Sequence, residues 1–257
     1  MSSFVLEASG LVKTYGQTRA LGGVDLRVRT GESLAIMGAS GSGKTTLLHC
    51  LAGIVPADTG SVSFLSGAGR VEVTALGERE RSRLRREAFG FVFQQGLLIP
   101  ELTAVENVAL ALMLNGMPRA RAEEYGRGWL AALGLGGLEE RRIGQLSGGQ
   151  AQRVAIARAQ VTGATVVFAD EPTGALDSAT SAEVMQALLD STTGQGRTLV
   201  VVTHDADVAG RCSRIVDMRD GRIVGERVPA GAAGSVPQAA AATGADASTG
   251  AASEVRA

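Results

Sequence analysis

Short apolar runs recur along the chain, separated by longer polar or amphipathic stretches. The first thirty residues predict short strands, and within them Val24, Leu26 and Val28 alternate with charged residues, which is the period-two pattern of a half-buried strand. Later runs are continuously apolar, as in strands covered on both faces, and lie at residues 33–37, 90–93, 165–169 and 198–202. These runs predict a mostly parallel sheet whose strands are separated by helices.

Three further stretches complete the predicted architecture. Residues 96–163 follow a chiefly helical pattern and predict a helical subdomain set off from the sheet. Asp220-Gly221 lies between two apolar runs and predicts a closing β-hairpin. From Pro229 onward, Ala, Gly, Ser, Thr and Pro dominate, and these residues bury too little apolar surface to fold. We therefore expect one α/β domain over residues 1–228 and a disordered tail over residues 229–257.

The composition limits the kinds of partner. The 257 residues carry a net charge of −1, which gives no reason to expect non-specific nucleic-acid binding. No signal peptide is visible, and no apolar stretch reaches the ~18 residues of a membrane span. Cys50 and Cys212 each lie in an apolar stretch, which favours buried thiols over a disulfide. These observations favour a cytoplasmic protein.

A glycine-rich loop follows the apolar run at residues 33–37. Its sequence is Gly38-Ala39-Ser40-Gly41-Ser42-Gly43-Lys44-Thr45, and a helical pattern continues from there to Leu51. A strand, a glycine loop and a helix in this order form a P-loop, whose backbone amides and helix N-terminus hold phosphates. In such a loop Lys44 contacts the β- and γ-phosphates and Thr45 holds Mg²⁺. The full match predicts a nucleoside triphosphate site rather than a plain surface loop.

Polar residues follow the other apolar runs where the strands are expected to end. They are Gln94 after the second run, Asp170 and Glu171 after the third, and His204 after the fourth. The carboxyl ends of parallel strands open onto the ligand crevice of such a sheet. There Asp170 suits Mg²⁺ and Glu171 suits polarisation of the attacking water. His204 can donate to the γ-phosphate, and Gln94 can touch the metal or the water. Each residue alone fits an ordinary strand end, but with the P-loop they indicate hydrolysis.

A second glycine-rich turn, Leu146-Ser147-Gly148-Gly149-Gln150, opens the helical pattern that runs to Gln160. Ser147 is a good N-cap, and the two glycines leave backbone amides exposed. A simple turn explains this stretch equally well when it is considered alone. As an anion site it would have no phosphate in its own chain, which predicts that a second copy supplies one.

Three other features have plain alternatives. Tyr15 can stack on a base, or it can be an ordinary surface-strand tyrosine. His49 lies inside the P-loop helix and is expected to pack there. Residues 78–87 mix both charge signs and predict a solvated helix rather than a nucleic-acid patch.

Together, these motifs resemble the ATP-binding subunits of ABC transporters over residues 11–226. The P-loop is similar to the Walker A motif, residues 146–150 to the signature motif, and Asp170-Glu171 to the Walker B pair. Further matches are Tyr15 to the adenine-stacking aromatic, Gln94 to the Q-loop, Ala175-Leu176-Asp177 to the D-loop and His204 to the switch histidine.

The resemblance implies a P-loop NTPase fold of the ABC ATPase type, with a mostly parallel core sheet, an N-terminal antiparallel β part and an α-helical subdomain. It assigns catalysis to Glu171, His204 and Gln94, and Mg²⁺ to Thr45, Gln94 and Asp170. ATP contacts fall on Tyr15, Gly38, Ala39, Ser40, Gly41, Ser42, Gly43, Lys44, Thr45, Thr46, Ser147, Gly148, Gly149, Gln150 and Asp177.

The resemblance also implies a head-to-tail dimer around two ATP molecules, docked on a membrane permease at the cytoplasmic face of the membrane. Residues 84–108 resemble the macrolide-efflux and lipoprotein-release group, to which cell-division subunits are close. Ala151 and Ala175 depart from the usual family pattern without removing a catalytic group.

We expect an ATPase that powers export or extraction of a hydrophobic or lipid-linked substrate. The alternative is a regulatory module of the cell-division type, which signals through a membrane partner without moving cargo. A soluble ABC protein of translation or DNA repair is disfavoured, because the chain has neither a tandem cassette nor a long coiled coil.

Overall fold

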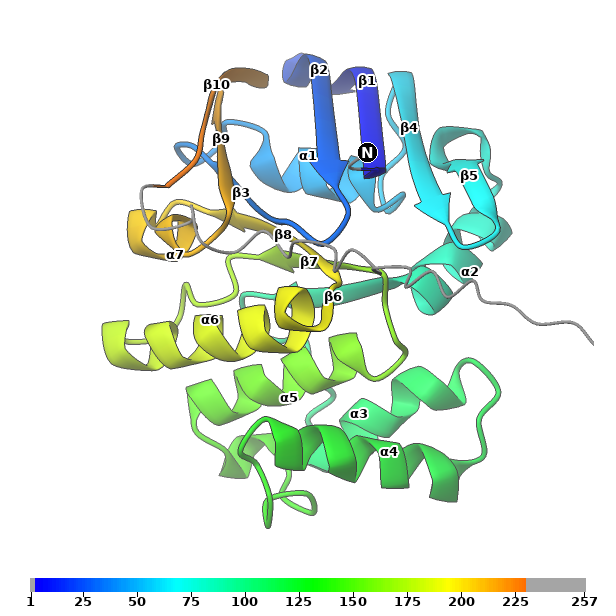
Figure 1. Cartoon of the computed structure of the whole chain (residues 1–257), viewed down its shortest axis with the longest axis vertical. Helices are drawn as coiled ribbons and strands as arrows, with labels where there is room; N and C mark the ends of the chain where they lie inside the picture. Colours follow the sequence, from blue (N-terminus) through cyan, green and yellow to red (C-terminus); the bar gives the residue numbers. More distant parts are fainter. Residues whose placement is uncertain (1–2, 230–257) are drawn as a thin grey trace, which may run out of the picture.

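The computed structural model describes residues 3–229, so the expected disordered tail lies, apart from Pro229, outside the described residues. Two sheets form the framework (Figure 1). The four-stranded sheet is antiparallel and has the order β2 (Thr18–Arg29), β1 (Phe4–Tyr15), β4 (Thr59–Ser66) and β5 (Gly69–Glu72). The six-stranded sheet has the order β10 (Arg222–Arg227), β9 (Arg214–Arg219), β3 (Ser33–Met37), β8 (Thr198–Thr203), β7 (Val166–Asp170) and β6 (Phe89–Phe93).

The helices connect these strands. They are α1 (Lys44–Leu51), α2 (Glu78–Ala88), α3 (Ala104–Met113), α4 (Arg119–Ala132), α5 (Gly148–Gln160), α6 (Ser178–Thr192) and α7 (Ala206–Gly210), with short 3₁₀ turns at Val73–Ala75, Ile143–Gln145 and Thr193–Gln195. This is the predicted α/β architecture. The expected hairpin around Asp220-Gly221 is confirmed as β9 and β10.

The first thirty residues correct one expectation, because short strands were predicted there and two twelve-residue strands are present. The pairing of β1 with β2 shifts register at several places, one of them between Ala8 and Leu11. Gly10 and Gly23 adopt positive φ angles of 59° and 87°. Such irregularities interrupt the alternation in the sequence without ending the strand.

The six-stranded sheet is parallel from β6 to β9, and only its edge strand β10 is antiparallel. Successive side chains of a strand point to opposite faces. Accordingly, Val200 and Val202 of β8 belong to one buried cluster, and Leu199 and Val201 belong to another. The sheet is therefore buried on both faces, which explains the continuously apolar runs.

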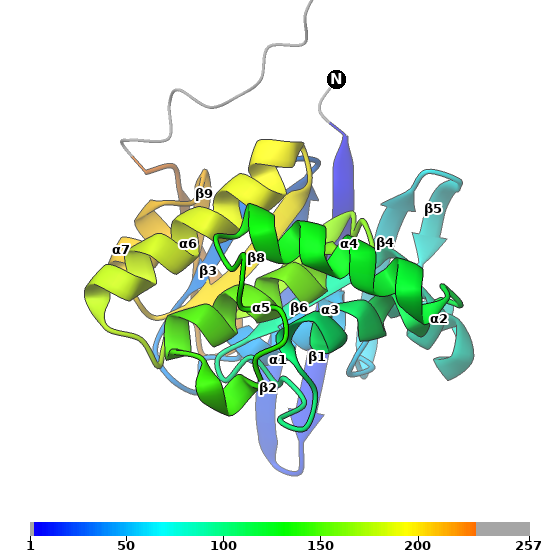
Figure 2. The ribbon, with the colours of Figure 1, turned by 90° about the horizontal axis from the view of Figure 1, so that it is seen from below.

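The two faces are covered by different layers (Figures 1 and 2). On one face lie α1 and the four-stranded sheet, with an edge-to-face aromatic stack of Phe64, Phe89 and Phe168 at centroid distances of 5.0 and 5.3 Å. On the other face lie α3, α4, α5 and α6. Residues 96–163 contain α3, α4 and α5, and their division into a separate subdomain stays a prediction. The P-loop helix and the helix after the second glycine turn thus belong to opposite layers.

Several smaller expectations are met. Helix α2 buries none of its residues and carries ion pairs such as Arg85–Glu78 at 2.7 Å, as expected of a solvated helix. Cys50 and Cys212 are buried thiols without a disulfide. Among residues 3–229, no helix is long and apolar enough to span a bilayer.

Candidate functional site

The P-loop connects the end of β3 to the start of α1. Gly43 is the N-cap of α1 with φ 98°, a left-handed conformation that favours glycine. A Cβ atom added to Gly43 would lie 2.3 Å from the Ala20 carbonyl oxygen, and one added to Gly38 would lie 2.3 Å from the Met218 carbonyl oxygen. These two glycines let the loop pack closely against neighbouring backbone.

Lys44 folds back over the loop. Its ammonium group donates hydrogen bonds to the carbonyl oxygens of Gly38 at 2.9 Å and Ala39 at 2.8 Å. The Ser42 hydroxyl is buried beside it and has no hydrogen-bond partner in the described part of the chain. An ammonium group and an orphaned hydroxyl inside a glycine loop are donors that suit phosphate oxygens.

Thr45 of α1 and Asp170 of β7 are joined by a hydrogen bond. The Thr45 hydroxyl donates to Asp170 Oδ1 at 3.1 Å. Burial raises the pKa of the Asp170 carboxyl, and the Thr45 hydrogen bond partly opposes that rise. A half-buried carboxylate next to a hydroxyl is the oxygen donor set that Mg²⁺ uses beside phosphates.

Glu171 follows Asp170 in a strained conformation. Its φ angle is 48°, which is uncommon for a residue other than glycine, and its amide donates to the Val202 carbonyl oxygen at 2.9 Å. His204 Nδ1 donates to Glu171 Oε1 at 2.8 Å, and Thr203 donates to Oε2 at 3.3 Å. The sequence argument named Glu171 and His204 but missed Thr203, because a threonine that ends an apolar strand carries no distinguishing pattern.

Gln94 comes directly after β6, at the same edge of the sheet. Its neighbour Phe93 pairs with Asp170 in the parallel ladder. A Cβ atom added to Gly174 would lie 2.9 Å from Gln94 Nε2, so the Gln94 amide reaches the loop that follows Glu171. The structure therefore brings Gln94, Asp170, Glu171 and His204 to one edge, beside the P-loop.

These residues fit a nucleoside triphosphate with Mg²⁺. Within residues 3–229 there is no group of three His, Cys, Asp or Glu residues placed to hold a metal ion by themselves. Mg²⁺ at phosphate sites takes one or two protein ligands and completes its shell with phosphate oxygens and water. Thr45 and Asp170 supply such a partial set.

The second glycine turn is a separate surface. Ser147 Oγ accepts from the Gln150 amide at 3.2 Å, and Gln150 Oε1 accepts from the Ser147 amide at 2.9 Å, which is a capping box. The amides of Gly148 and Gly149 take no part in this box. No hydrogen bond or ion pair among the described residues joins this turn to the P-loop.

The loop around Asp177 supports the second glycine turn. Asp177 caps α6 and accepts from the Thr180 hydroxyl at 2.6 Å. A Cβ atom added to Gly149 would lie 2.4 Å from the Thr180 methyl carbon. The start of α5 therefore packs tightly on the start of α6, and Thr180 is a further residue that the sequence did not single out.

Two predicted nucleotide contacts lie at the edges of this region. Tyr15 ends β1 and is half exposed, with the Lys13 ammonium 5.6 Å from its ring centroid. Lys13 in turn pairs with Asp58 at 2.8 Å. Thr46 is partly buried in the first turn of α1. The nucleotide contacts of Tyr15 and Thr46 stay predictions.

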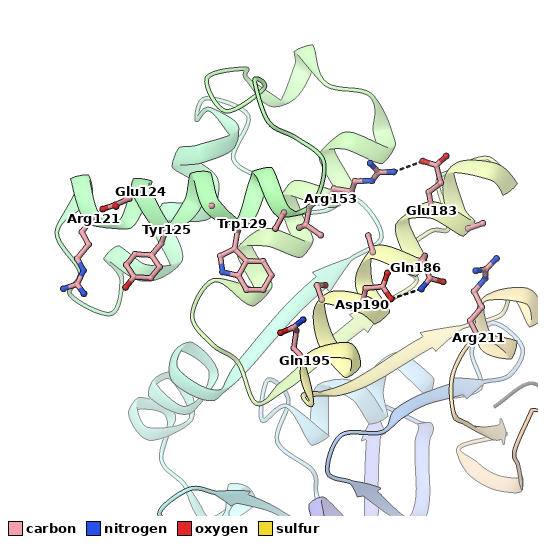
Figure 3. Close-up of a pocket in the computed structure, with 16 residues that line it drawn as sticks. Arg121, Glu124, Tyr125, Trp129, Arg153, Glu183, Gln186, Asp190, Gln195 and Arg211 are labelled. Carbon is pink, nitrogen blue, oxygen red and sulfur yellow. Dashed lines mark hydrogen bonds and ion pairs between the residues drawn. The ribbon is translucent and has the colours of Figure 1, made fainter. Parts of the chain in front are cut away.

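A groove of about 1390 Å³ lies between α4, α5 and α6 (Figure 3). Tyr125, Trp129 and Arg153 line it, and Arg153 pairs with Glu183 across it at 2.6 Å. It shares no lining residue with the P-loop or with the carboxylates of β7. The groove is therefore separate from the predicted phosphate site.

The fold and the phosphate-binding edge of the six-stranded sheet define a P-loop ATPase. The sequence model of the family described as "ABC transporter" matches residues 21–174 of this chain. The chain belongs to the ABC transporter family, as an ATP-binding cassette.

Known relatives agree with the predicted subgroup. The chain is 45% identical to the macrolide export ATP-binding/permease protein MacB of Nitrosomonas europaea over 87% of this chain and 34% of that protein. It is 46% identical to the pyoverdine export ATP-binding/permease protein PvdT of Pseudomonas aeruginosa over 86% of this chain and 34% of that protein. The chain thus spans about a third of the length of these relatives. The predicted resemblance to the macrolide-efflux group is confirmed.

A solved structure matches almost end to end. The dimeric structure of MJ0796, a bacterial ABC transporter cassette, has a TM-score of 0.79 and 38% identity, covering 88% of this chain and 99% of that one. A second structure of MJ0796, a dimeric post-hydrolysis state bound to ADP and Pi, has a TM-score of 0.78.

Proposed function

We propose that this chain is the ATP-driven subunit of an ABC exporter or lipid-extraction system. In this proposal two copies close head to tail around two Mg²⁺–ATP molecules and thereby drive a membrane permease at the cytoplasmic face. The observation that carries the proposal is the pair of glycine-rich helix starts, at α1 and α5, on opposite layers of one chain. One has a lysine and carboxylates beside it, and the other has only amides and a capping serine.

The residues of the first surface have separate roles in this proposal. Lys44 exchanges the carbonyl oxygens of Gly38 and Ala39 for the β- and γ-phosphates, and Ser42 gains a partner. Thr45 and Asp170 hold Mg²⁺, and Gln94 is the third residue that contacts the metal. Glu171 orients the attacking water, and His204 leaves Glu171 to donate to the γ-phosphate.

The second copy supplies the other half of each site. Ser147, Gly148 and Gly149 would meet the γ-phosphate with the Ser147 hydroxyl and the two glycine amides, because a helix N-terminus favours anions. Asp177 fixes the neighbouring loop by capping α6. The dimeric structures of MJ0796 support dimerisation of a cassette of the same family.

The loop after Gln94 is the surface that we propose for the permease. Leu97 is 59% exposed and has a positive φ angle of 46°. Arg158 of α5 holds this loop by donating to the carbonyl oxygens of Gly96 at 2.6 Å and Leu97 at 2.7 Å. An exposed leucine held in an uncommon backbone conformation suits a docking contact. Movement of this loop would reach α5, and hence the second phosphate surface, through Arg158.

The test is co-purification of the tagged chain from detergent-solubilised membranes of its host, with partners identified by mass spectrometry. We expect a multi-span permease with an export-type architecture. Leu97→Asp should lose that partner, whereas Val224→Asp, which changes a similarly exposed residue on β10 (62% exposed), should keep it. Recovery of a cell-division partner would favour the regulatory hypothesis, and recovery with ribosomal or DNA-associated proteins would contradict a membrane function.

A further inference from the structure

Thr203 ends β8 and lies against the carboxylate proposed to orient water. Its side chain is buried. Its hydroxyl oxygen accepts from the Asp205 amide at 3.0 Å, and its proton points to Glu171 Oε2 at 3.3 Å. A hydroxyl that already accepts from a backbone amide has its own proton left to donate. Thr203 is therefore an oriented donor to Glu171.

The two donors that hold Glu171 differ in their freedom. Thr203 is β-branched and buried at a strand end, and the next turn fixes its Asp205 partner, because Asp205 caps α7 by accepting from the Asp207 amide at 2.8 Å. The His204 side chain is 69% exposed. Only the His204 contact can open without disturbing the strand.

The surroundings of Glu171 also hold Oε2 more firmly than Oε1. Its backbone amide is held by Val202 at 2.9 Å, so β8 contacts both its main chain and Oε2. Glu171, Thr203, His204 and Asp205 line a cavity of about 590 Å³. Oε1, once released by His204, would face this cavity while Oε2 stayed in place.

We propose that Thr203 is a positioning residue for ATP hydrolysis. It keeps the Glu171 carboxylate oriented through Oε2 during the step in which His204 releases Oε1 and turns to the γ-phosphate. The inference rests on the proposed role of Glu171 as the carboxylate that orients water. Without Thr203, Glu171 would lose its last side-chain donor at the moment when its orientation matters.

The test compares Thr203→Val with Thr203→Ser by phosphate release from Mg²⁺–ATP. Valine keeps the shape but removes the hydroxyl, so kcat should fall about tenfold while KM changes less than about twofold. Serine restores the hydroxyl, and kcat should return to within about threefold of the native value. The Val variant should also accumulate the ATP-bound dimer.

Thr198→Val is the matched control. Thr198 is the first residue of β8, at the opposite end of the strand from Thr203. It is fully buried, and its hydroxyl accepts from the Gly31 amide at 3.0 Å. Loss of the Thr198 hydroxyl should lower the thermal stability about as much as Thr203→Val does and should leave kcat unchanged. Equal kcat for the two valine variants, with native turnover intact and Glu171→Gln inactive, would overturn this inference alone. Absence of ATP hydrolysis by the native chain would overturn the proposed function and this inference together.

Discussion

The two glycine-rich loops of this chain both open a helix, yet the helices begin differently. Gly43 caps α1 in a left-handed conformation and makes no side-chain cap hydrogen bond. Ser147 caps α5 in an extended conformation and forms a reciprocal capping box with Gln150. Both helix starts are rich in glycine, but only the α5 start is capped by its own side chains.

The charges around the loops differ even more. Lys44 lies in the first loop, and Asp170 and Glu171 lie beside it. The first turn of α5 carries no acidic residue, and its neighbours are the Thr180 methyl and Leu176. In the proposed function, the first surface holds the nucleotide and activates water, whereas the second completes the site of another copy. This difference is the physical reason to expect a dimer.

The largest effect that separates the two surfaces should come from Glu171→Gln. Loss of the carboxylate should lower turnover by about 10²–10⁴-fold, because it removes the group that orients the water. ATP binding should persist, and the closed dimer should accumulate, as measured by size-exclusion chromatography with ATP. Near-native turnover would refute the role assigned to Glu171.

A smaller loss is expected from Lys44→Ala. The ammonium group is the main charged donor of the P-loop, so ATP affinity should fall by about 10- to 100-fold. Titration calorimetry with a non-hydrolysed ATP analogue measures this change. Arg83→Ala is the control, because Arg83 pairs with Glu87 on the exposed helix α2 and should not alter ATP binding. Unchanged affinity of Lys44→Ala would contradict the phosphate contact.

On the other surface, Gly149→Ala should lower the free energy of unfolding by about 1–3 kcal/mol, because its methyl group would overlap the Thr180 methyl. Thr180→Ser removes that methyl group and keeps the hydroxyl that binds Asp177. The double variant Gly149→Ala with Thr180→Ser should therefore recover most of the loss in chemical denaturation. If it recovers nothing, the close packing of α5 on α6 is not what requires this glycine.

The smallest effect concerns pH. Burial lowers the pKa of His49 in α1 below its ordinary value of 6.5. The unfolded chain then binds a proton that the folded chain resists, so stability is full above pH 6.5 and falls as the pH drops below it. His49→Gln should flatten this fall in denaturation measurements between pH 7 and pH 5.5. An unchanged slope would show that His49 titrates normally in the fold.

The sequence predicted where the residues of the first surface meet, because the pattern that marks them is local. A P-loop needs glycines, a lysine and a threonine at fixed spacing, and the apolar strands place Asp170, Glu171, Gln94 and His204 at one edge. The contacts that hold these groups are not local. Thr203 and Thr180 act through residues more than thirty positions away or through a neighbouring helix, and nothing in their local pattern marks them.

The strand lengths near the start show a second limit. Gly10 and Gly23 have positive φ angles, and β1 and β2 continue through register shifts there, so that two long strands are present where short ones were predicted. The expected disorder beyond residue 229 falls outside the described part of the chain and stays a prediction.

The most direct test of the central claim is complementation between two variants that are each expected to lose turnover, Glu171→Gln and Ser147→Arg. Each variant alone lacks one half of every composite site and should hydrolyse almost no ATP. In a mixture, a mixed dimer joins the intact P-loop and Glu171 of one copy to the intact Ser147 turn of the other, and about a quarter of native activity should return if the copies pair at random. If both variants fold and the mixture dimerises but no activity returns, each site is built within a single chain and the account is wrong.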